Sequence, residues 1–345
     1  MVSFRLRSDS ENSARALGRR GVIRGLVLGL FALALCLAGN DPAQAQTSDK
    51  LAAPQSHSVL TRDGLRISFT YWASPLGDQA PVVLLLHMQN GNRLDWPSNF
   101  TLTLQKSGYA VIAPDLRGHG QSKGGAGSLI GASDLSASAT TKSEKTVESE
   151  HFKPVDYQLM VTADLEAIKD DFIFKEHQEH RLNMNKMAIV GAEMGANIGA
   201  AFATLDWLKR PHPDARLIQD RTPRGQDVRA LVLLSPQTSI PGMPITESIK
   251  TLKNPALNVA FLVGVGSKDK ADRGQARNIY RQLTTPEKNK ERMYFQEYDA
   301  PFRGTNLLGR RLRTEEHILA FLDQHLKKID SPWRDRQSRI GRTTE

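Results

Sequence analysis

The segment Tyr109-Ala-Val-Ile-Ala-Pro-Asp-Leu-Arg-Gly-His-Gly-Gln-Ser122 joins a short apolar run to a polar loop that contains two glycines. An uninterrupted apolar run of this kind is typical of a strand buried on both faces of a parallel sheet. In such sheets, ligand sites lie beyond the carboxyl ends of the strands. The loop over residues 115–122 is therefore expected at the edge of the sheet where a functional site forms.

Apolar strands and helical patterns alternate on both sides of this segment. The predicted strands cover residues 58–60, 65–72, 81–87, 109–114, 187–191, 230–235, 259–265 and 292–297, and the predicted helices cover residues 96–107, 156–176, 194–208, 271–283 and 314–328. Strands that alternate with helices of this length predict an α/β fold, with a mainly parallel sheet of about eight strands and helices on both faces.

The first 45 residues have the pattern of an export signal peptide. Basic residues, among them Arg19 and Arg20, precede an uncharged apolar run of 15 residues over 25–39, and Ala43-Gln-Ala45 forms a small-x-small cleavage site. The run is shorter than the roughly 20 residues of a spanning helix. We expect a periplasmic or secreted protein with no stable membrane span after cleavage; an uncleaved anchor is the alternative. The arginine pair also resembles the twin-arginine export signal.

The basic excess of the chain lies mostly at its two ends. The 345 residues include 46 basic and 37 acidic ones, a formal charge of +9. Residues 1–45 hold six basic and three acidic residues, and so does the basic tail over 327–345, which we expect to be frayed. The remainder carries about +3, too little and too mixed to predict a nucleic-acid partner. The single cysteine, Cys36, lies in the leader, which excludes a thiol nucleophile in the mature chain.

Residues 46–326 are predicted to form one domain with a polar insertion. Residues 121–154 are rich in Gly, Ser, Ala and Thr and have almost no large apolar side chain, so they cannot form a core of their own. We interpret the insertion as a mobile surface segment. Because it leaves from the carboxyl end of a central strand, a flap over the site is the second interpretation.

Three segments together resemble the α/β-hydrolase superfamily, in its lysophospholipase-like and serine-aminopeptidase-like branch. Leu84-Leu-Leu-His-Met-Gln-Asn-Gly91 is similar to the strand and oxyanion loop of that fold, and residues 109–122 are close to its DLRGHGxS signature. Met187-Ala-Ile-Val-Gly-Ala-Glu-Met-Gly-Ala196 has the layout of the nucleophile elbow, in which a sharp turn joins a strand to a helix. The resemblance covers residues 57–326.

The resemblance implies an oxyanion site at the Met88 and Met194 backbone and a triad of nucleophile, histidine and acid. The triad departs from the family pattern. The apex of the elbow is Glu193 and no G-x-S-x-G occurs elsewhere, Arg303 stands at the histidine position, and only Asp269 matches the family's acid. Because a helix is expected within about ten residues of the strand that ends at 235, there is no room for a large cap domain.

The substitutions predict a charge network in place of the triad. Arginine stays protonated at any accessible pH, so it can neither accept a proton from a nucleophile nor return one to a leaving group. A guanidinium can bond two carboxylates at once, here those of Glu193 and Asp269. The hypothesis is an exported pseudoenzyme that binds a small ligand or a protein in the cleft, or has a structural role.

An active hydrolase of ester, amide or related bonds remains the alternative. It would use Glu193 as a carboxylate nucleophile, or an unrecognised nucleophile such as Ser122 or Ser235. Whether the chain turns over any substrate stays open at this point.

The remaining histidines do not predict a metal or cofactor site. His177 and His180 lie three apart on a helix, but without an H-E-x-x-H pattern or a third ligand we interpret them as a solvated helix end. His87 and His119 are expected to hold loop backbone, and Asp115 to order its own turn.

Overall fold

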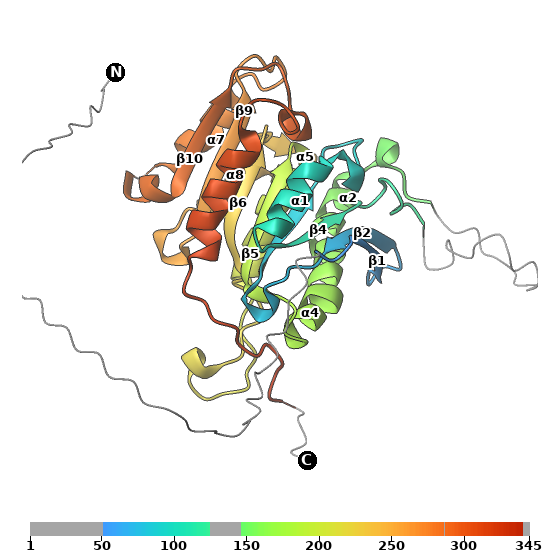
Figure 1. Ribbon diagram of the computed structural model, residues 1–345, viewed down its shortest axis with the longest axis vertical. Coiled ribbons are helices and arrows are strands. Elements are labelled where there is room, and N and C mark those ends of the chain that lie inside the picture. Colours follow the sequence, from blue (N-terminus) through green and yellow to red (C-terminus); the bar gives the residue numbers. More distant parts are fainter. Residues whose placement is uncertain (1–50, 125–145, 286, 341–345) are drawn as a thin grey trace, which may run out of the picture. The chain divides into compact units, whose positions relative to one another are not determined.

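One eight-stranded sheet organises the part of the chain that the computed structural model describes, residues 51–124, 146–285 and 287–340 (Figure 1). Its strands are β1 (Gln55–Leu60), β2 (Arg66–Trp72), β3 (Pro81–Leu86), β4 (Ala110–Pro114), β5 (Asn183–Ala192), β6 (Val228–Leu234), β9 (Ala260–Gly266) and β10 (Met293–Tyr298). The order across the sheet is β1-β2-β4-β3-β5-β6-β9-β10. β2 is antiparallel to both of its neighbours, and all other pairs are parallel. The predicted sheet is therefore confirmed.

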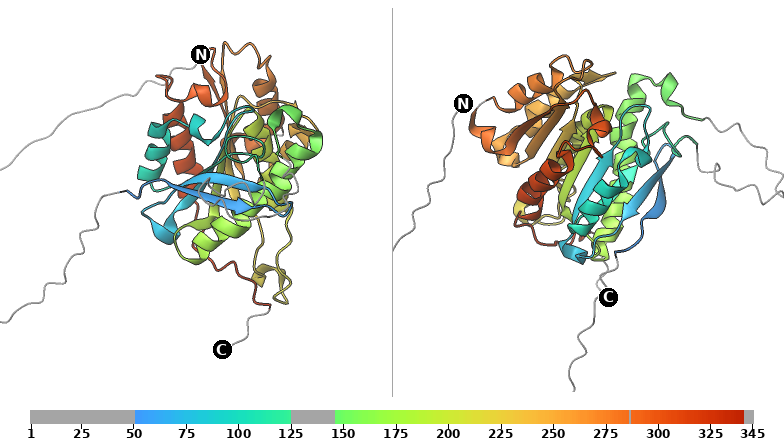
Figure 2. Two further views of the ribbon diagram at one scale, coloured as in Figure 1. Left: turned by 90° about the vertical axis from the view of Figure 1, so that its right-hand side faces the viewer. Right: turned by 45° about the horizontal axis from the view of Figure 1, so that its top comes forward.

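Helices cover both faces of this sheet. They are α1 (Ser98–Lys106), α2 (Pro154–Leu159), α3 (Leu165–Ala167), α4 (Phe174–Gln178), α5 (Met194–Leu208), α6 (Ile245–Leu252), α7 (Gln275–Leu283) and α8 (Thr314–Leu322). In the left view of Figure 2, the teal α1 and red α8 lie on one side of the sheet, and the green and yellow helices lie on the other. Two π-helical segments, Met160–Asp164 and Ile168–Ile173, join α2, α3 and α4 into one long helix.

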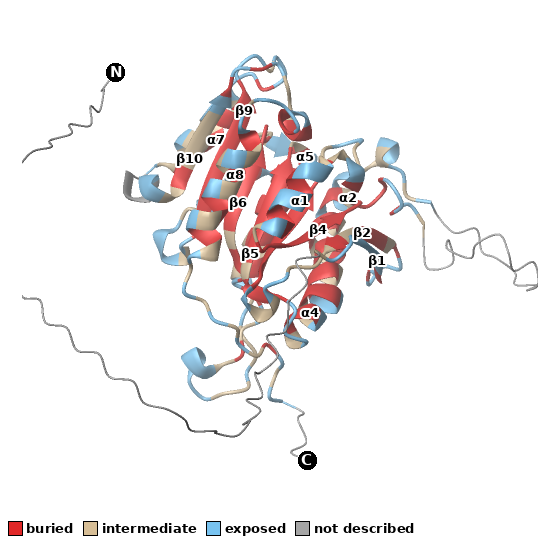
Figure 3. Cartoon of the chain, in the orientation of Figure 1, coloured by how far each residue is buried: buried red, intermediate tan, exposed pale blue. Residues whose placement is uncertain are grey.

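The parallel strands are buried on both faces because each side of the sheet has its own apolar core (Figure 3). Along β3, Val83 and Leu85 pack toward α1 and α8, whereas Val82, Leu84 and Leu86 pack toward the opposite layer. This alternation follows from the two-residue period of a strand. The continuous apolar runs in the sequence therefore predicted the central strands correctly.

The connection after β6 holds only the short strands β7 (Ser239–Ile240) and β8 (Met243–Pro244) before α6 begins. This agrees with the expected absence of a large cap domain. The predicted start at 271 of the helix over 271–283 is wrong, since the corresponding helix α7 begins at Gln275. Arg273 and Gly274 have positive φ angles of 48° and 80°, which are incompatible with a right-handed helix.

The predicted signal peptide over 1–45 and the centre of the 121–154 insertion lie outside the described residues. The described ends of the insertion are anchored: Val147 N–H donates to Lys123 O, and the Phe152 ring contacts the rings of His119 and Tyr157.

The prediction of a frayed C-terminal tail is wrong for its described part. Arg336 is buried and donates to both carboxylate oxygens of Asp227, at 2.5 and 2.9 Å. Trp333 stacks on His177 and His180, and its indole N–H donates to His177 O at 2.8 Å. His177 is therefore buried, so the solvated helix end that the sequence suggested is also incorrect at this residue. Apolar stacking and a buried ion pair hold this segment in place.

Candidate functional site

A strained turn joins β5 to α5 and places Glu193 beyond the carboxyl end of the sheet. Glu193 has φ 50° and ψ −112°, a conformation that a residue with a Cβ atom adopts only at a cost in free energy. The turn also needs glycine on either side. A Cβ atom at Gly191 would collide with Gly195 O, and one at Gly195 would collide with Leu86 O. Sequence and backbone together therefore form a sharp strand-to-helix elbow.

Two loops bring a second carboxylate and an arginine to Glu193. Asp269 follows β9, and Arg303 lies between β10 and α8. Arg303 Nε donates to Glu193 Oε1 at 2.8 Å, and Arg303 Nη1 donates to Asp269 Oδ2 at 3.0 Å. The side chains of Arg303 and Glu193 are 19% and 20% exposed, and that of Asp269 is 5% exposed. The ion-pair contacts that the sequence predicts among these three residues are present.

The two carboxylates keep Arg303 protonated. Burial opposes the charge of Arg303, but hydrogen bonds from the guanidinium to Glu193, together with the charge of Asp269, outweigh it and raise the pKa of Arg303 above its ordinary value. One guanidinium faces two carboxylate groups. The arrangement can hold a guanidinium between carboxylates, but that guanidinium cannot alternate between accepting and donating a proton near neutral pH.

The loop after β3 is positioned by two histidines. His87 Nε2 accepts a hydrogen bond from Leu116 N–H, and His87 Nδ1 lies 2.7 Å from Met88 O. His119 Nε2 accepts from Asn90 N–H at 3.2 Å. Burial, with the neighbouring His119, lowers the pKa of His87 to about 3, so its ring is neutral. The predicted backbone-holding role of both histidines is confirmed.

Asp115 ties this loop to the loop over residues 115–122. Its carboxylate accepts from the backbone N–H groups of Arg93 and Gln121, both at 2.8 Å, and forms a buried ion pair with the Arg93 side chain. Ordering of its own turn was predicted from the sequence, but Arg93 was missed. Arg93 begins a short 3₁₀ helix and carries no sequence signal that it is buried, so only the folded contact identifies it.

The resemblance implies an oxyanion site at the backbone of Met88, in the loop after β3, and of Met194, at the start of α5. Met194 is the first residue of α5, so its N–H has no intrahelical carbonyl partner. The Met88 carbonyl accepts from Gly91 N–H at 3.1 Å, which holds the loop in a turn. A Cβ atom at Gly304 would collide with the Met88 sulfur, which places the Met88 side chain beside the loop that carries Arg303.

The two serines considered as alternative nucleophiles have structural roles. Ser122 and Ser235 are fully buried. Ser122 Oγ accepts from Ser68 N–H at 2.9 Å, and Ser235 Oγ accepts from Gly304 N–H at 3.0 Å. Neither hydroxyl faces solvent or a substrate.

The fold and the elbow point to a known family, and a model of the alpha/beta hydrolase fold matches residues 81–277. The chain belongs to the α/β-hydrolase fold family. An esterase from Pyrococcus furiosus has a similar structure over 79% of this chain and 91% of its own, at 14% identity and a TM-score of 0.52. An acylaminoacyl peptidase from Pyrococcus horikoshii is similar over 84% of this chain and 44% of its own, at 13% identity and a TM-score of 0.55. At such identities the likeness shows the fold alone. No curated protein matches the sequence.

Five cavities of this α/β-hydrolase-fold chain are lined by other residues than the three of the elbow network. Glu193, Asp269 and Arg303 line none of five cavities of 240 to 640 Å³ in the described residues. Within the same ranges, no group of three or more His, Cys, Asp or Glu side chains is arranged to hold a metal ion. None of the described helices is long and apolar enough to cross a membrane.

Proposed function

We propose that this α/β-hydrolase-fold chain is a pseudoenzyme, which does not hydrolyse esters or amides and acts by binding a small ligand or a protein at the carboxyl edge of its sheet. One observation carries the proposal: the Arg303 guanidinium bonds Glu193 and Asp269, at 2.8 and 3.0 Å. In the family pattern these three positions hold the nucleophile, the histidine and the acid. An ion pair therefore occupies the positions that would otherwise perform the chemistry.

The surroundings of the elbow support this proposal. Hydrolysis through an acyl intermediate needs a base that directs water at it, and the loop over 298–312 contains no histidine. Ser122 and Ser235 cannot substitute as nucleophiles, because both are buried and both accept backbone hydrogen bonds. The fold by itself is not evidence of turnover.

One observation favours the alternative of an active hydrolase. The strained backbone at Glu193 is the kind of conformation that persists at catalytic residues, and its side chain is partly exposed. In this alternative the Glu193 carboxylate attacks the acyl carbon, the leaving group departs, and water then cleaves the resulting anhydride. Arg303, which stands at the family's base position, cannot accept the proton of that water, and the remaining carboxylate, that of Asp269, is bonded to Arg303 at 3.0 Å.

The two functions predict different outcomes with a fluorophosphonate probe and a panel of short-chain esters and amides. We expect no labelling, and no hydrolysis above that of the Glu193→Gln variant. The proposal would be contradicted if the unchanged chain hydrolyses a substrate and Glu193→Gln abolishes that hydrolysis. The double variant Glu193→Ser with Arg303→His places a serine and a histidine at the family positions. If it restores no activity, more than the triad differs from the family pattern. Circular dichroism checks that each variant is folded.

A further inference from the structure

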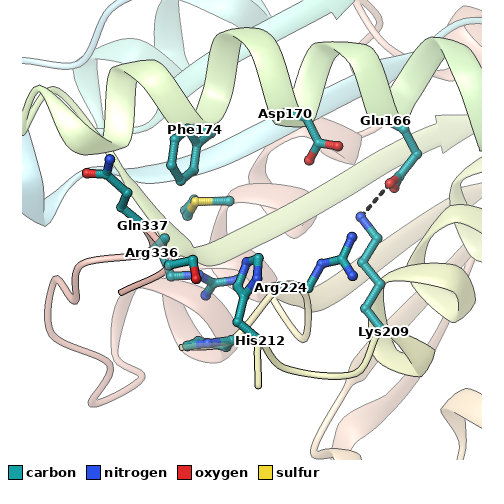
Figure 4. A pocket seen from close by; sticks show the side chains of 11 residues that line it. Glu166, Asp170, Phe174, Lys209, His212, Arg224, Arg336 and Gln337 are labelled. Atoms are coloured by element: carbon teal, nitrogen blue, oxygen red, sulfur yellow. Dashed lines mark ion pairs between the residues drawn. The ribbon is translucent and has the colours of Figure 1, made fainter. Parts of the chain in front are cut away.

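A second candidate site lies at the opposite end of the sheet from Glu193. Its cavity of about 320 Å³ is bounded by the long helix over 154–178, the loop over 209–224 and the docked segment over 336–338 (Figure 4). Met184, at the start of β5, lines the cavity, whereas Glu193 follows the end of that strand. At 3.3 Å per residue, the nine residue steps from Met184 to Glu193 separate the two sites by about 30 Å. The cavity is thus independent of the elbow.

The two main walls of this cavity carry opposite charges. Glu166 and Asp170 come from the helix, and Lys209, His212 and Arg224 come from the loop. Glu166 and Lys209 neutralise each other in an ion pair, marked by the dashed line in Figure 4. The charge that a ligand would meet in the cavity therefore comes from the other charged residues of the two walls.

Asp170 and Arg224 remain as a separated pair of unlike charges. Both side chains are exposed, and neither has an ion-pair partner among the described residues. Figure 4 shows Asp170 directed from the helix toward the loop and Arg224 directed back from the loop. Arg336 also lines the cavity, but its guanidinium already donates hydrogen bonds to both carboxylate oxygens of Asp227. Among the described residues that line the cavity, Asp170 and Arg224 thus supply a carboxylate and a guanidinium that have no ion-pair partner.

Apolar side chains complete the lining beside these charges. Phe174, Met184 and Pro223 all line the cavity, and Met184 is buried. A pocket with an apolar wall and a few convergent polar groups is the usual composition of a small-molecule site.

We propose that this cavity binds a small zwitterion of the α-amino-acid type with an apolar side chain. The ammonium group would bond Asp170, the carboxylate would bond Arg224, and the side chain would pack on Phe174 and Met184. A ligand with a single charge leaves the other protein charge without a partner, whereas a zwitterion satisfies both with charge-assisted hydrogen bonds.

Three ligands that differ by one charge test the proposal by isothermal titration calorimetry on the full chain: L-leucine, N-acetyl-L-leucine and L-leucinamide. We expect L-leucine to bind about tenfold more tightly than either analogue, because each analogue lacks one charged contact. Asp170→Asn should weaken L-leucine and L-leucinamide but not N-acetyl-L-leucine. Arg224→Gln should weaken L-leucine and N-acetyl-L-leucine but not L-leucinamide.

The neighbouring Asp171 supplies a matched control, since it lines a different cavity, and Asp171→Asn should bind L-leucine as the unchanged chain does. Glu193→Gln should also leave binding unchanged, which separates this site from the proposed function of the elbow. Absence of L-leucine binding, equal affinity for all three ligands, or equal losses in the Asp170 and Asp171 variants would overturn the proposal.

Discussion

Arg303 holds together two carboxylates that would otherwise repel each other. Glu193 and Asp269 reach it from different loops, and the three side chains are no more than 20% exposed. A cation in this position gains more than a surface pair does, because solvent screens it less. The network therefore contributes to the stability of the elbow, whatever the elbow binds.

Replacing Arg303 by glutamine is expected to lower the free energy of unfolding by about 2 kcal/mol, since Glu193 and Asp269 then lack their shared cation. Urea denaturation measures this loss. Lys268→Gln is the matched control: its partner Asp299 is 81% exposed, so the change should cost less than about 0.5 kcal/mol. In the double variant with Glu193→Gln, the losses should be less than additive. Additive losses would show that the two residues do not interact.

At the scale of elements, the docked C-terminal segment is as much a part of the fold as a helix. Its Arg336 enters a buried charge network in which Lys169 bonds Asp206 and Asp227. The two cations outweigh the effect of burial and lower the pKa of Asp227, which stays ionised. Two buried anions are thus balanced by two buried cations, one of them supplied by the end of the chain.

Arg336→Met should lower the free energy of unfolding by about 3–5 kcal/mol, because it leaves two buried carboxylates with one cation. Chemical denaturation checks this value against Arg334→Met, an exposed arginine two residues away that should cost less than about 0.5 kcal/mol. Equal stability of the two variants would mean that the Arg336 contact contributes nothing.

Comparison of two long-range ion pairs shows what the sequence could predict. Arg303 and Glu193 are 110 residues apart, and Arg336 and Asp227 are 109 apart. Only the first pair was predicted, because each partner stands at a recognisable position of a family pattern. The strands were predictable from local apolar runs for a similar reason. Arg336 lies in a polar segment with no periodicity, and nothing in its neighbourhood indicates that it is buried.

Across the whole molecule, four buried histidines make stability depend on pH. Burial lowers the pKa of His87 to about 3 and that of His325 to about 4, and it also lowers the pKa values of His119 and His177. In the unfolded chain these rings take up protons below their ordinary pKa of 6.5. The unfolded state therefore binds more protons than the folded state as the pH falls below that value.

The free energy of unfolding should accordingly decrease from pH 6.5 downward, and His87 alone should account for about 2 kcal/mol between pH 6.5 and 4.5. Denaturation at a series of pH values measures the slope. His325→Phe removes one titrating ring and should reduce the slope, while the exposed His151→Gln should keep it. A stability that is flat over this range would refute the expectation.

The docking of Arg336 also sets the time at which the protein can finish folding. Asp227 is synthesised 109 residues before the arginine that balances it. At about 5–20 residues per second, the ribosome takes roughly 5–20 s to cover that interval. During this time the base of the sheet lacks one of its two buried cations. Native packing at that end is thus postponed until Arg336 has been synthesised.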